Sequence, residues 1–346
     1  MAAPLGEGVL AVRARSSSAD PLGLCIVGCG RFATFHAAAA RRLRRRVRLA
    51  FASRDLARAE AYRRRFGGFA AFGSYEAAAA DPRVEGLLVC TPHHLHLPHT
   101  RLGAAHGKAV LLEKPIARTV AEADEVLATA RAAGIVLMVA ENLPFMPAFA
   151  AARAAIRAGA IGTVRQIVVS ARGFRAPRGW RSRRIEMGGG LLVDGGIHYV
   201  RLLQDWAGPV AWLTATAPPN LFAGLEAEDT AFVLFRFRDG AVATLVNSVA
   251  APGVPSWQWA WATGTGGSLG VDHRGRVLWI RRPSGQRLRV FLRDRRGLSA
   301  QLGAFVDAVR AGRPPDPGPE AARADLAIVE AAYRSLQSGA PVVLHS

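Results

Sequence analysis

The fold of this chain is decided by the stretch LGLCIVGCGRFA, which occupies residues 22–33. Its first six residues form a mostly apolar run, Gly28 and Gly30 follow at once, and a helical pattern begins near Ala33. Glycine permits a tight turn and lets other groups approach the backbone closely. A strand, a glycine turn and a helix in this order predict the first unit of an α/β sheet.

The same alternation of short apolar runs and helical patterns continues to Asn142, as in a parallel sheet. Thr119, followed by Glu122 three residues later, indicates a helix N-terminus with a capping box. We predict a doubly wound Rossmann domain over residues 21–142, after a flexible leader over residues 1–20. The expected strands are 22–27, 47–52, 69–72, 86–90, 109–112 and 135–140, and the expected helices begin near residues 33, 55, 75, 97 and 120.

Beyond residue 143 the strand-like runs follow one another without helices between them, which indicates an antiparallel sheet. We predict a C-terminal α+β domain over residues 143–346 with a large, mostly antiparallel open sheet. One face should be covered by the helix around Asp194, and the other should be exposed or paired with a partner subunit. The expected strands are 164–170, 210–215, 230–237, 241–249 and 277–280, with helices ending at 158 and spanning 302–310 and 319–336.

The composition narrows the function classes. The 346 residues carry a net charge of +19, but the arginines are spread along the chain without interleaved aromatics, so we expect no nucleic-acid partner. No apolar run is long enough for a membrane span. The first twenty residues lack the pattern of a secretion signal. Three unevenly spaced cysteines fit a reducing compartment, and we therefore expect a cytoplasmic protein.

The glycine turn at Gly28 and Gly30 predicts a dinucleotide site, because the turn admits a pyrophosphate and the next helix offers its N-terminal amides. Arg31 and Phe32 lie at that helix start. The second expected strand ends at Ser53 and Arg54, where a site for NAD would usually place Asp or Glu. We therefore predict NADP in preference to NAD; a carboxylate one residue further on, at position 55, keeps NAD open.

Lys114 is one of only two lysines, and it ends an apolar run in the sequence Glu113-Lys114-Pro115. An ammonium group on a flexible stem can position a substrate hydroxyl or share a proton, whereas a guanidinium stays charged and needs planar partners. The second lysine, Lys108, follows Gly107 and is expected to be a solvated turn residue. Lys114 is therefore the first candidate for a chemical role.

Asp194 and His198 form the second candidate, since a helical segment would place them four residues apart on one face. A carboxylate beside an imidazole can orient the ring and favour proton transfer near neutral pH. A structural hydrogen bond explains the same pair.

Four stretches together resemble the Gfo/Idh/MocA oxidoreductase family: the glycine turn at 28–36, TPHHLH at 91–96, Glu113-Lys114-Pro115, and residues 188–198. The resemblance covers nearly all of the chain after the leader. It implies that Lys114, Asp194 and His198 are catalytic and that the peptide before Pro115 is cis. Arg201 departs from the pattern, because many relatives carry an acid there.

The resemblance further implies reversible hydride transfer between a nicotinamide and a carbinol carbon of a sugar, cyclitol or related polyol. His198 would move the hydroxyl proton, Lys114 would polarise the oxygen, and Asp194 would orient the substrate or His198. The implied cofactor contacts are Gly28, Gly30, Arg31, Phe32, Ser53, Arg54, Thr91, Pro92, His94, His96, Glu113 and Lys114, and the implied substrate contacts are Lys114, Asn142, Trp180, Arg181, Asp194 and His198.

Two alternative functions remain: a nicotinamide-dependent glycosidase of the same family that works by transient oxidation and elimination, and a cofactor-sensing regulator without catalysis. The three histidines between residues 93 and 96 suggest a metal, but no carboxylate or cysteine cluster accompanies them, so we expect none. A homodimer or homotetramer formed through the C-terminal sheet is expected.

Overall fold

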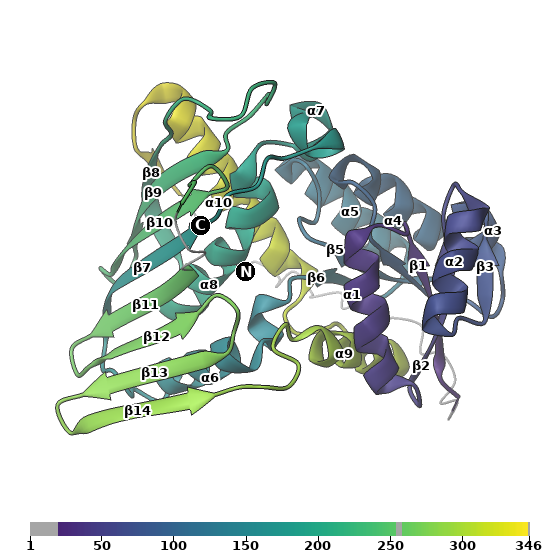
Figure 1. Ribbon diagram of the computed structural model, residues 1–346, viewed down its shortest axis with the longest axis horizontal. Helices are drawn as coiled ribbons and strands as arrows, with labels where there is room; N and C mark the ends of the chain where they lie inside the picture. The colour runs from purple at the N-terminus through teal and green to yellow at the C-terminus, as the bar shows by residue number, and fades with distance from the viewer. Residues whose placement is uncertain (1–19, 254–257, 345–346) are drawn as a thin grey trace, which may run out of the picture.

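The computed structural model describes residues 20–253 and 258–344, which fold around two β-sheets (Figure 1). The predicted leader lies outside the described residues except for Asp20. Within the described ranges, none of the helices combines the length and the apolar character that crossing a membrane requires.

The first sheet has six parallel strands in the order β3-β2-β1-β4-β5-β6, which confirms the predicted Rossmann arrangement. Its central strands are buried along their whole length, because helices cover both faces of a parallel sheet. The strand order reverses between β1 and β4, which opens a crevice at their carboxyl ends. The strands are β1 (Leu22–Val27), β2 (Val47–Ala52), β3 (Ala70–Phe72), β4 (Gly86–Val89), β5 (Ala109–Glu113) and β6 (Leu137–Ala140).

The helices between these strands begin within two residues of the predicted positions. Thr119 caps α5 by accepting a hydrogen bond from the Glu122 amide, as predicted. The return bond of the capping box goes instead from the Arg118 amide to Glu122. The helices are α1 (Arg31–Ala40), α2 (Leu56–Phe66), α3 (Tyr75–Ala80), α4 (His96–Ala105) and α5 (Val120–Ala133).

The second sheet has nine strands in the order β14-β13-β12-β11-β7-β10-β9-β8-β15. All neighbours are antiparallel except β7 and β10, which confirms the mostly antiparallel sheet. Along β9 buried and exposed residues alternate, since one face contacts helices and the other does not. The strands are β7 (Val164–Arg172), β8 (Val210–Thr216), β9 (Thr230–Phe237), β10 (Val242–Ser248), β11 (Gln258–Gly264), β12 (Ser268–Asp272), β13 (Val277–Arg282), β14 (Gly285–Val290) and β15 (Val342–Val343).

Four of these strands, β11, β12, β14 and β15, were not predicted. In β11 the buried positions are Ala260 and Ala262, and alanine has a low strand propensity, so the alternation is weak in sequence. Every residue of β14 is exposed, so that strand has no apolar side to reveal it. Pairing with neighbouring strands, rather than local pattern, makes these segments extended.

The helices of the second half cover one face of its sheet, but one of them returns to the first sheet. Helix α9 lies beside α1, and Leu302 and Phe305 join the apolar cluster of Leu22 and Leu24 (Figure 1). Helix α9 therefore completes the apolar core on one face of the first sheet. These helices are α6 (Pro147–Arg157), α7 (Arg184–Met187), α8 (Ile197–Ala207), α9 (Leu298–Ala311) and α10 (Pro319–Ser338).

Lys108 is not the solvated turn residue that we predicted. Its side chain is buried just before β5, and its ammonium donates hydrogen bonds to the carbonyls of Asp81 and Val84 at 3.0 and 2.7 Å. The loop before β4 closes over the start of β5, so these carbonyls replace water around the charge. Lys108 therefore has a structural role.

Candidate active site

The carboxyl end of β1 forms the predicted glycine turn. Gly28 has a φ of +94°, and a Cβ at this position would lie 2.9 Å from Thr91 Cγ2 and 3.2 Å from the carbonyl carbon of Cys90. A larger residue would therefore push β1 and β4 apart. Gly30 precedes α1, whose first turn carries no acidic side chain. The unpaired amides at this helix start suit an anionic group.

The carboxyl end of β2 presents cations to the same cleft. Ser53, Arg54 and Arg58 line it. Asp55 is turned toward α2, where its Oδ1 accepts a hydrogen bond from the Arg58 amide at 3.3 Å. Among the residues the structure describes, the acids that line the cleft are Glu113 and Asp194, and neither belongs to this strand end.

Lys114 follows β5, and the Lys114–Pro115 peptide is cis, which confirms the prediction. The preceding Glu113 is buried and holds the turn from two sides. Its Oε1 lies 2.5 Å from His36 Nε2, and its Oε2 accepts a hydrogen bond from the Lys114 amide at 3.2 Å. The backbone that carries the ammonium is therefore anchored to α1.

Asp194 meets Lys114 across the cleft, although the two residues are 80 positions apart. The Lys114 ammonium donates to the Asp194 carbonyl and lies 3.4 Å from its Oδ1, while Arg181 Nε donates to Oδ2 at 3.0 Å. Burial by itself would raise the pKa of Asp194, but the charges of Lys114 and Arg181 hold it well below its ordinary value. Asp194 is therefore an anion that positions two cations.

His198 is paired with Glu141, which the sequence analysis did not name. Its Nδ1 lies 2.8 and 2.7 Å from the two carboxylate oxygens of Glu141, which follows β6 and is buried. Burial raises the pKa of Glu141, but the charge and hydrogen bond of His198 outweigh it and the net shift is downward. The carboxylate therefore holds the ring in one orientation.

This arrangement corrects the expected pairing of Asp194 with His198. Residues Leu192–Gly196 form a π-helical turn, which leads directly into α8. Because a π turn closes i→i+5 bonds, the α-helical spacing of four no longer places the two side chains over each other. Asp194 faces Lys114 and His198 faces Glu141.

The run Gly188-Gly189-Gly190 brings this helix close to its neighbours. A Cβ on Gly189 would lie 2.3 Å from the Tyr333 hydroxyl, and one on Gly190 would lie 2.2 Å from Glu228 Oε2. Tyr333 and Glu228 both accept hydrogen bonds from backbone amides of this segment. The Tyr333 hydroxyl accepts from the Gly190 amide at 2.9 Å, and Glu228 accepts from the Leu192 amide at 2.8 Å. The glycines therefore set the position of Asp194 by close approach.

The three histidines after β4 have different surroundings. His96 is fully buried, and its ring nitrogens lie 2.8 Å from the Pro115 carbonyl and 3.1 Å from the Thr91 carbonyl. His94 Nδ1 lies 3.7 Å from Glu186. His93, which we had considered only as a metal ligand, is the one that lines the cleft. We had expected His94 and His96 to contact the cofactor, but neither lines the cleft. The ring of His96 points into the fold because α4 begins at this residue.

Trp180 and Arg181 line the cleft beside His93, and both were expected to line it. The Arg181 guanidinium lies 4.2 Å from the Trp180 ring centroid, and the Trp180 ring meets His93 edge-on at 4.6 Å. Asn142 does not join them, because its Nδ2 donates to the Arg296 carbonyl at 2.8 Å. Arg201 lies 3.2 Å from Asp205 on α8 and 3.4 Å from Asp325 on α10.

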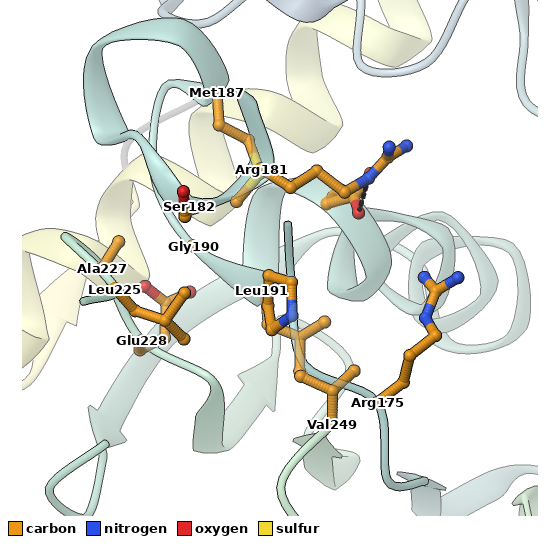
Figure 2. Close-up of a pocket in the computed structure, with 12 residues that line it drawn as sticks. Arg175, Arg181, Ser182, Met187, Gly190, Leu191, Leu225, Ala227, Glu228 and Val249 are labelled. Carbon is orange, nitrogen blue, oxygen red and sulfur yellow. Dashed lines mark hydrogen bonds and ion pairs between the residues drawn. The ribbon is translucent and has the colours of Figure 1, made fainter. Parts of the chain in front are cut away.

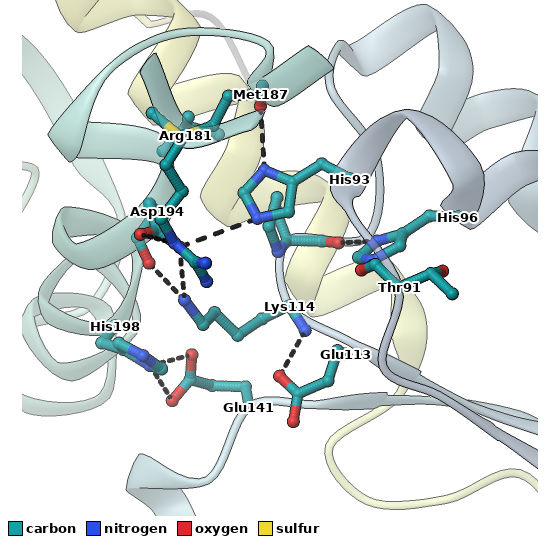
Figure 3. Close-up of polar contacts among 12 residues, drawn as sticks. Thr91, His93, His96, Glu113, Lys114, Glu141, Arg181, Met187, Asp194 and His198 are labelled. Carbon is teal, nitrogen blue, oxygen red and sulfur yellow. Dashed lines mark hydrogen bonds and ion pairs between the residues drawn. The ribbon is translucent and has the colours of Figure 1, made fainter. Parts of the chain in front are cut away.

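Most of the expected site residues thus meet in one cleft between the two sheets. Figure 3 shows Lys114, Asp194 and Arg181 close together, with the His198–Glu141 pair beside them. His198, unlike the other two proposed catalytic residues, is not among the residues that line the cleft, and neither is Glu141. A smaller hollow adjoins it and shares Arg175, Arg181 and Asp194 (Figure 2). The cleft lining includes Gly28, Gly30, Arg31, Phe32, Ser53, Arg54, Thr91, Pro92, Glu113, Lys114, Trp180, Arg181 and Asp194, and also the unexpected His93, Arg58, Tyr75 and Arg175.

Models of known protein families match the two parts of the chain that form this cleft. Residues 22–141 match the sequence model of an oxidoreductase family with an NAD-binding Rossmann fold, and residues 149–270 match that of the GFO/IDH/MocA C-terminal domain. The chain belongs to the GFO/IDH/MocA family. Membership confirms the resemblance inferred from the four motifs and explains the pairing of a dinucleotide turn with an open sheet.

Among curated relatives, trans-1,2-dihydrobenzene-1,2-diol dehydrogenase of Mus musculus is 40% identical over 156 residues, which are 45% of this chain and 46% of the mouse protein. The 1,5-anhydro-D-fructose reductase of Ensifer adhaerens is 38% identical over 131 residues, which are 36% of this chain and 38% of that enzyme. The chain therefore matches about half or less of the length of these relatives.

Solved structures resemble nearly the whole fold. GenD2 from gentamicin A biosynthesis, in complex with NAD, is 29% identical with a TM-score of 0.84 and covers 96% of this chain and 99% of its own. The aldose-aldose oxidoreductase of Caulobacter crescentus is 27% identical with a TM-score of 0.85 and covers 94% and 100%. The likeness to these structures thus extends across both sheets.

Proposed function

We propose that the protein is an NADP-preferring oxidoreductase that interconverts a hydroxyl-bearing carbon and a ketone in a sugar, cyclitol or related polyol. The observation that carries the proposal is the contact of Lys114 with Asp194 beside the His198–Glu141 pair, at the sheet edge that also bears the glycine turn. A cation that can bind an oxygen and an imidazole that can take a proton are the two groups this chemistry needs.

The residues present fit a dinucleotide, because the turn at Gly28 leaves no room for a Cβ and the start of α1 offers amides without an acid. Gly28, Gly30 and Arg31 would hold the pyrophosphate, and Glu113 would keep the Lys114 backbone in place. When bound, the nicotinamide supplies the hydride acceptor or donor.

The chain itself handles the oxygen and its proton. Lys114 would donate a hydrogen bond to the substrate oxygen and stabilise the charge that develops there. Glu141 accepts from His198 Nδ1, so Nε2 is the ring nitrogen that would exchange the hydroxyl proton with the substrate. Asp194 keeps the Lys114 ammonium directed into the cleft. Removal of Lys114 or His198 should therefore lower turnover without unfolding the protein.

The preference for NADP is supported by the cations at the end of β2. Arg54 and Arg58 line the cleft there, while Asp55 is used as the cap of α2. A 2′-phosphate would be held by these guanidiniums, whereas the ribose hydroxyls of NAD would find no carboxylate free to accept from them.

The test is Arg54→Ala, with KM measured for both cofactors. We expect the KM for NADP⁺ to rise about tenfold, which corresponds to roughly 1.4 kcal/mol of lost charge-assisted bonding, and the KM for NAD⁺ to change little. Arg48→Ala, which removes an arginine on β2 itself but outside the cleft lining, is the control. Equal affinity of the unaltered protein for both cofactors would defeat the preference.

The substrate class is supported by the wall of Trp180 and Arg181 and by the hydroxylated compounds in the names of the two curated relatives. The test is a screen of sugars, cyclitols and polyols with NADP⁺ and NAD⁺, with Lys114→Met and His198→Ala as controls. Full turnover by both variants would refute the site. Turnover of glycosides with an unchanged cofactor pool would identify the glycosidase, and cofactor binding without any turnover would identify the regulator.

We further propose that the open face of the second sheet forms a homodimer or homotetramer. Val168, Phe232, Leu234 and Val242 are exposed on neighbouring strands of this face, and such a patch would be costly in water. Light scattering of the purified protein tests this. Phe232→Glu should produce monomers, whereas Leu56→Glu, an exposed apolar position on α2, should not.

A further inference from the structure

Arg175 is a cation of the cleft to which the proposed chemistry gives no role. It lies on the loop after β7, and like Arg181 it lines both the cleft and the smaller hollow beside it. Its backbone amide donates to the Val249 carbonyl at 2.9 Å, which ties this loop to the end of β10. Among the residues that the structure describes, no acceptor bonds to its guanidinium. The charge is therefore available to a molecule in the cleft.

The acids near Arg175 are already engaged by other groups. The Asp194 carboxylate lies 3.4 Å from the Lys114 ammonium and 3.0 Å from Arg181 Nε. Glu228, which also lines the hollow, accepts hydrogen bonds from a backbone amide and from a tyrosine hydroxyl, and burial raises its pKa toward the neutral form. The cations at this end of the cleft therefore exceed the ionised acids.

The cleft as a whole has the same excess of positive charge. Among the described residues that line it are two acids, Glu113 and Asp194, and six cations, Arg31, Arg54, Arg58, Lys114, Arg175 and Arg181. A bound NADP⁺ would bring a net charge of about −3, because its phosphates carry about −4 and its nicotinamide carries +1. About one positive charge then remains, and a substrate with a single negative charge would balance it.

The two arginines lie where a substrate would extend beyond its reacting carbon. Figure 2 shows the side chains of Arg175 and Arg181 reaching the same side of Leu191. Asp194 connects this place to the reacting oxygen, since Arg181 donates to one of its carboxylate oxygens and Lys114 lies 3.4 Å from the other. An anion held by the arginines would therefore lie close to a carbinol held by Lys114.

A carboxylate is the anion that suits this place. It carries one negative charge at neutral pH, whereas a phosphate monoester carries nearly two. Its two oxygens also match the planar fork of a guanidinium. We propose that Arg175, together with Arg181, binds a carboxylate of the substrate, so that the protein oxidises a hydroxyl of a sugar acid. This inference rests on the proposed function, which by itself requires no charge on the substrate.

The test compares matched acids and amides as substrates with NADP⁺: D-glucuronate with D-glucuronamide, and D-galacturonate with D-galacturonamide. In each, one CH–OH loses a hydride to NADP⁺ and a proton to the protein, giving a carbonyl group. The amide keeps the shape of the acid and removes its charge. In the unaltered protein we expect kcat/KM for the acid to exceed that for the amide about tenfold to a hundredfold.

Two arginine variants show whether Arg175 carries this preference. Arg175→Leu should lower the ratio of acid to amide about tenfold. Arg178→Leu is the matched control and should keep the ratio, since Arg178 is an exposed residue of the same loop that lines neither the cleft nor the hollow. Added salt should slow the acid more than the amide.

Three outcomes would overturn the proposal. The first is equal rates with acid and amide in the unaltered protein. The second is an equal loss of both rates in Arg175→Leu, as expected of a purely structural residue. The third is a preference for glucose 6-phosphate over glucose that exceeds the preference for acid over amide, because the anion bound there would then be a phosphate.

Failure of the parent function is read separately. If only uncharged polyols are turned over, the parent function stands and the sugar acid is refuted. If no compound reduces NADP⁺, or if Lys114→Met turns over normally, the oxidoreductase site is refuted. The carboxylate site is then tested by calorimetric titration of the NADP⁺-loaded protein with glucuronate and glucuronamide. Tighter binding of the acid that is lost in Arg175→Leu and kept in Arg178→Leu supports it, and equal or absent binding of the two overturns it.

Discussion

Charged residues have opposite roles at the two ends of the strands in the parallel sheet. We call the side where the strands begin the amino edge and the side where they end the carboxyl edge. At the amino edge, Lys108 donates to two carbonyls, and Glu85, just before β4, is paired with Arg310 at 3.0 Å. At the carboxyl edge, Lys114 faces a cleft whose lining also holds Arg54, which follows β2, and Arg31 at the start of α1. Both edges belong to the same strands, and β5 has a lysine next to each of its ends, Lys108 buried and Lys114 partly buried.

The difference teaches that burial of a lysine does not by itself indicate a function. The chain crosses from strand to helix at the carboxyl edge, where helix N-termini and strand ends converge on one crevice. At the amino edge, loops close over the strand starts and satisfy their polar groups internally. The same residue type is therefore structural at one edge and available to a ligand at the other.

The largest expected effect comes from removing the charge at the carboxyl edge. Lys114→Met should lower kcat/KM about 10²- to 10³-fold, since it removes the group proposed to stabilise charge on the reacting oxygen. The melting temperature should change much less than the rate. Steady-state kinetics and thermal denaturation measure the two quantities. A fully active Lys114→Met variant would show that the lysine at the carboxyl edge has no functional role.

The next effect concerns the carboxylate behind His198. Glu141→Gln should lower kcat about tenfold to a hundredfold, because a neutral amide holds the ring less firmly than an anion does. The KM for NADP⁺ should be unchanged, since Glu141 does not line the cleft. Glu141→Asp should retain part of the rate. A variant with altered cofactor affinity but normal kcat would contradict this role.

At the amino edge the expectation is reversed. Lys108→Met should lower the free energy of unfolding by about 1–3 kcal/mol, because two carbonyls lose their donor in a buried place. Turnover at 25 °C should stay close to normal. Chemical denaturation with parallel rate measurements tests both statements. Lys108→Arg, which keeps a donor, is the matched control and should lose less stability.

As the pH falls, the fold should lose stability at the carboxyl edge before it does so at the amino edge. His99, whose Nδ1 lies 2.9 Å from Thr91 Oγ1, has its pKa lowered by burial from 6.5 to about 4. The fold therefore favours the neutral ring, so this stability is present above pH 6.5 and is lost as the pH falls toward 4. At pH 5 the loss is up to about 2 kcal/mol. Burial also lowers the pKa of His93 and of His96, so protonation of these rings removes stability over the same pH range.

Hydrogen exchange at pH 7 and pH 5 measures this difference. We expect amides around residues 91–96 to lose protection at the lower pH before amides around residues 81–86 do. Equal loss at both edges would show that the buried histidines do not set the acid response.

Sequence was sufficient for features that a few neighbouring residues decide. The glycine turn at Gly28, the cap at Thr119 and the apolar strands of the first sheet were predicted because each depends on local conformation or on continuous burial. Strand β14 could not be predicted, because all of its residues are exposed and only pairing with β13 makes it extended.

The candidate site was predicted in its residue types more fully than in its contacts. Lys114, Asp194 and His198 were named from motifs, but the partner of His198 was not. Glu141 follows a different strand and lies 57 residues away, so no local spacing connects them. His93 was passed over because three histidines in four positions look alike until the start of α4 turns His96 inward.

By itself the sequence determined that this protein has a dinucleotide turn, a parallel sheet and a rare lysine at a strand end, since these are properties of short segments. Only the tertiary structure decided which charges meet. It placed Asp194 against Lys114 and Glu141 against His198, and it enclosed Lys108 among carbonyls. The physical reason is that the pairing and solvation of a charge depend on groups distant in sequence, which come together only when the strands and helices close around them.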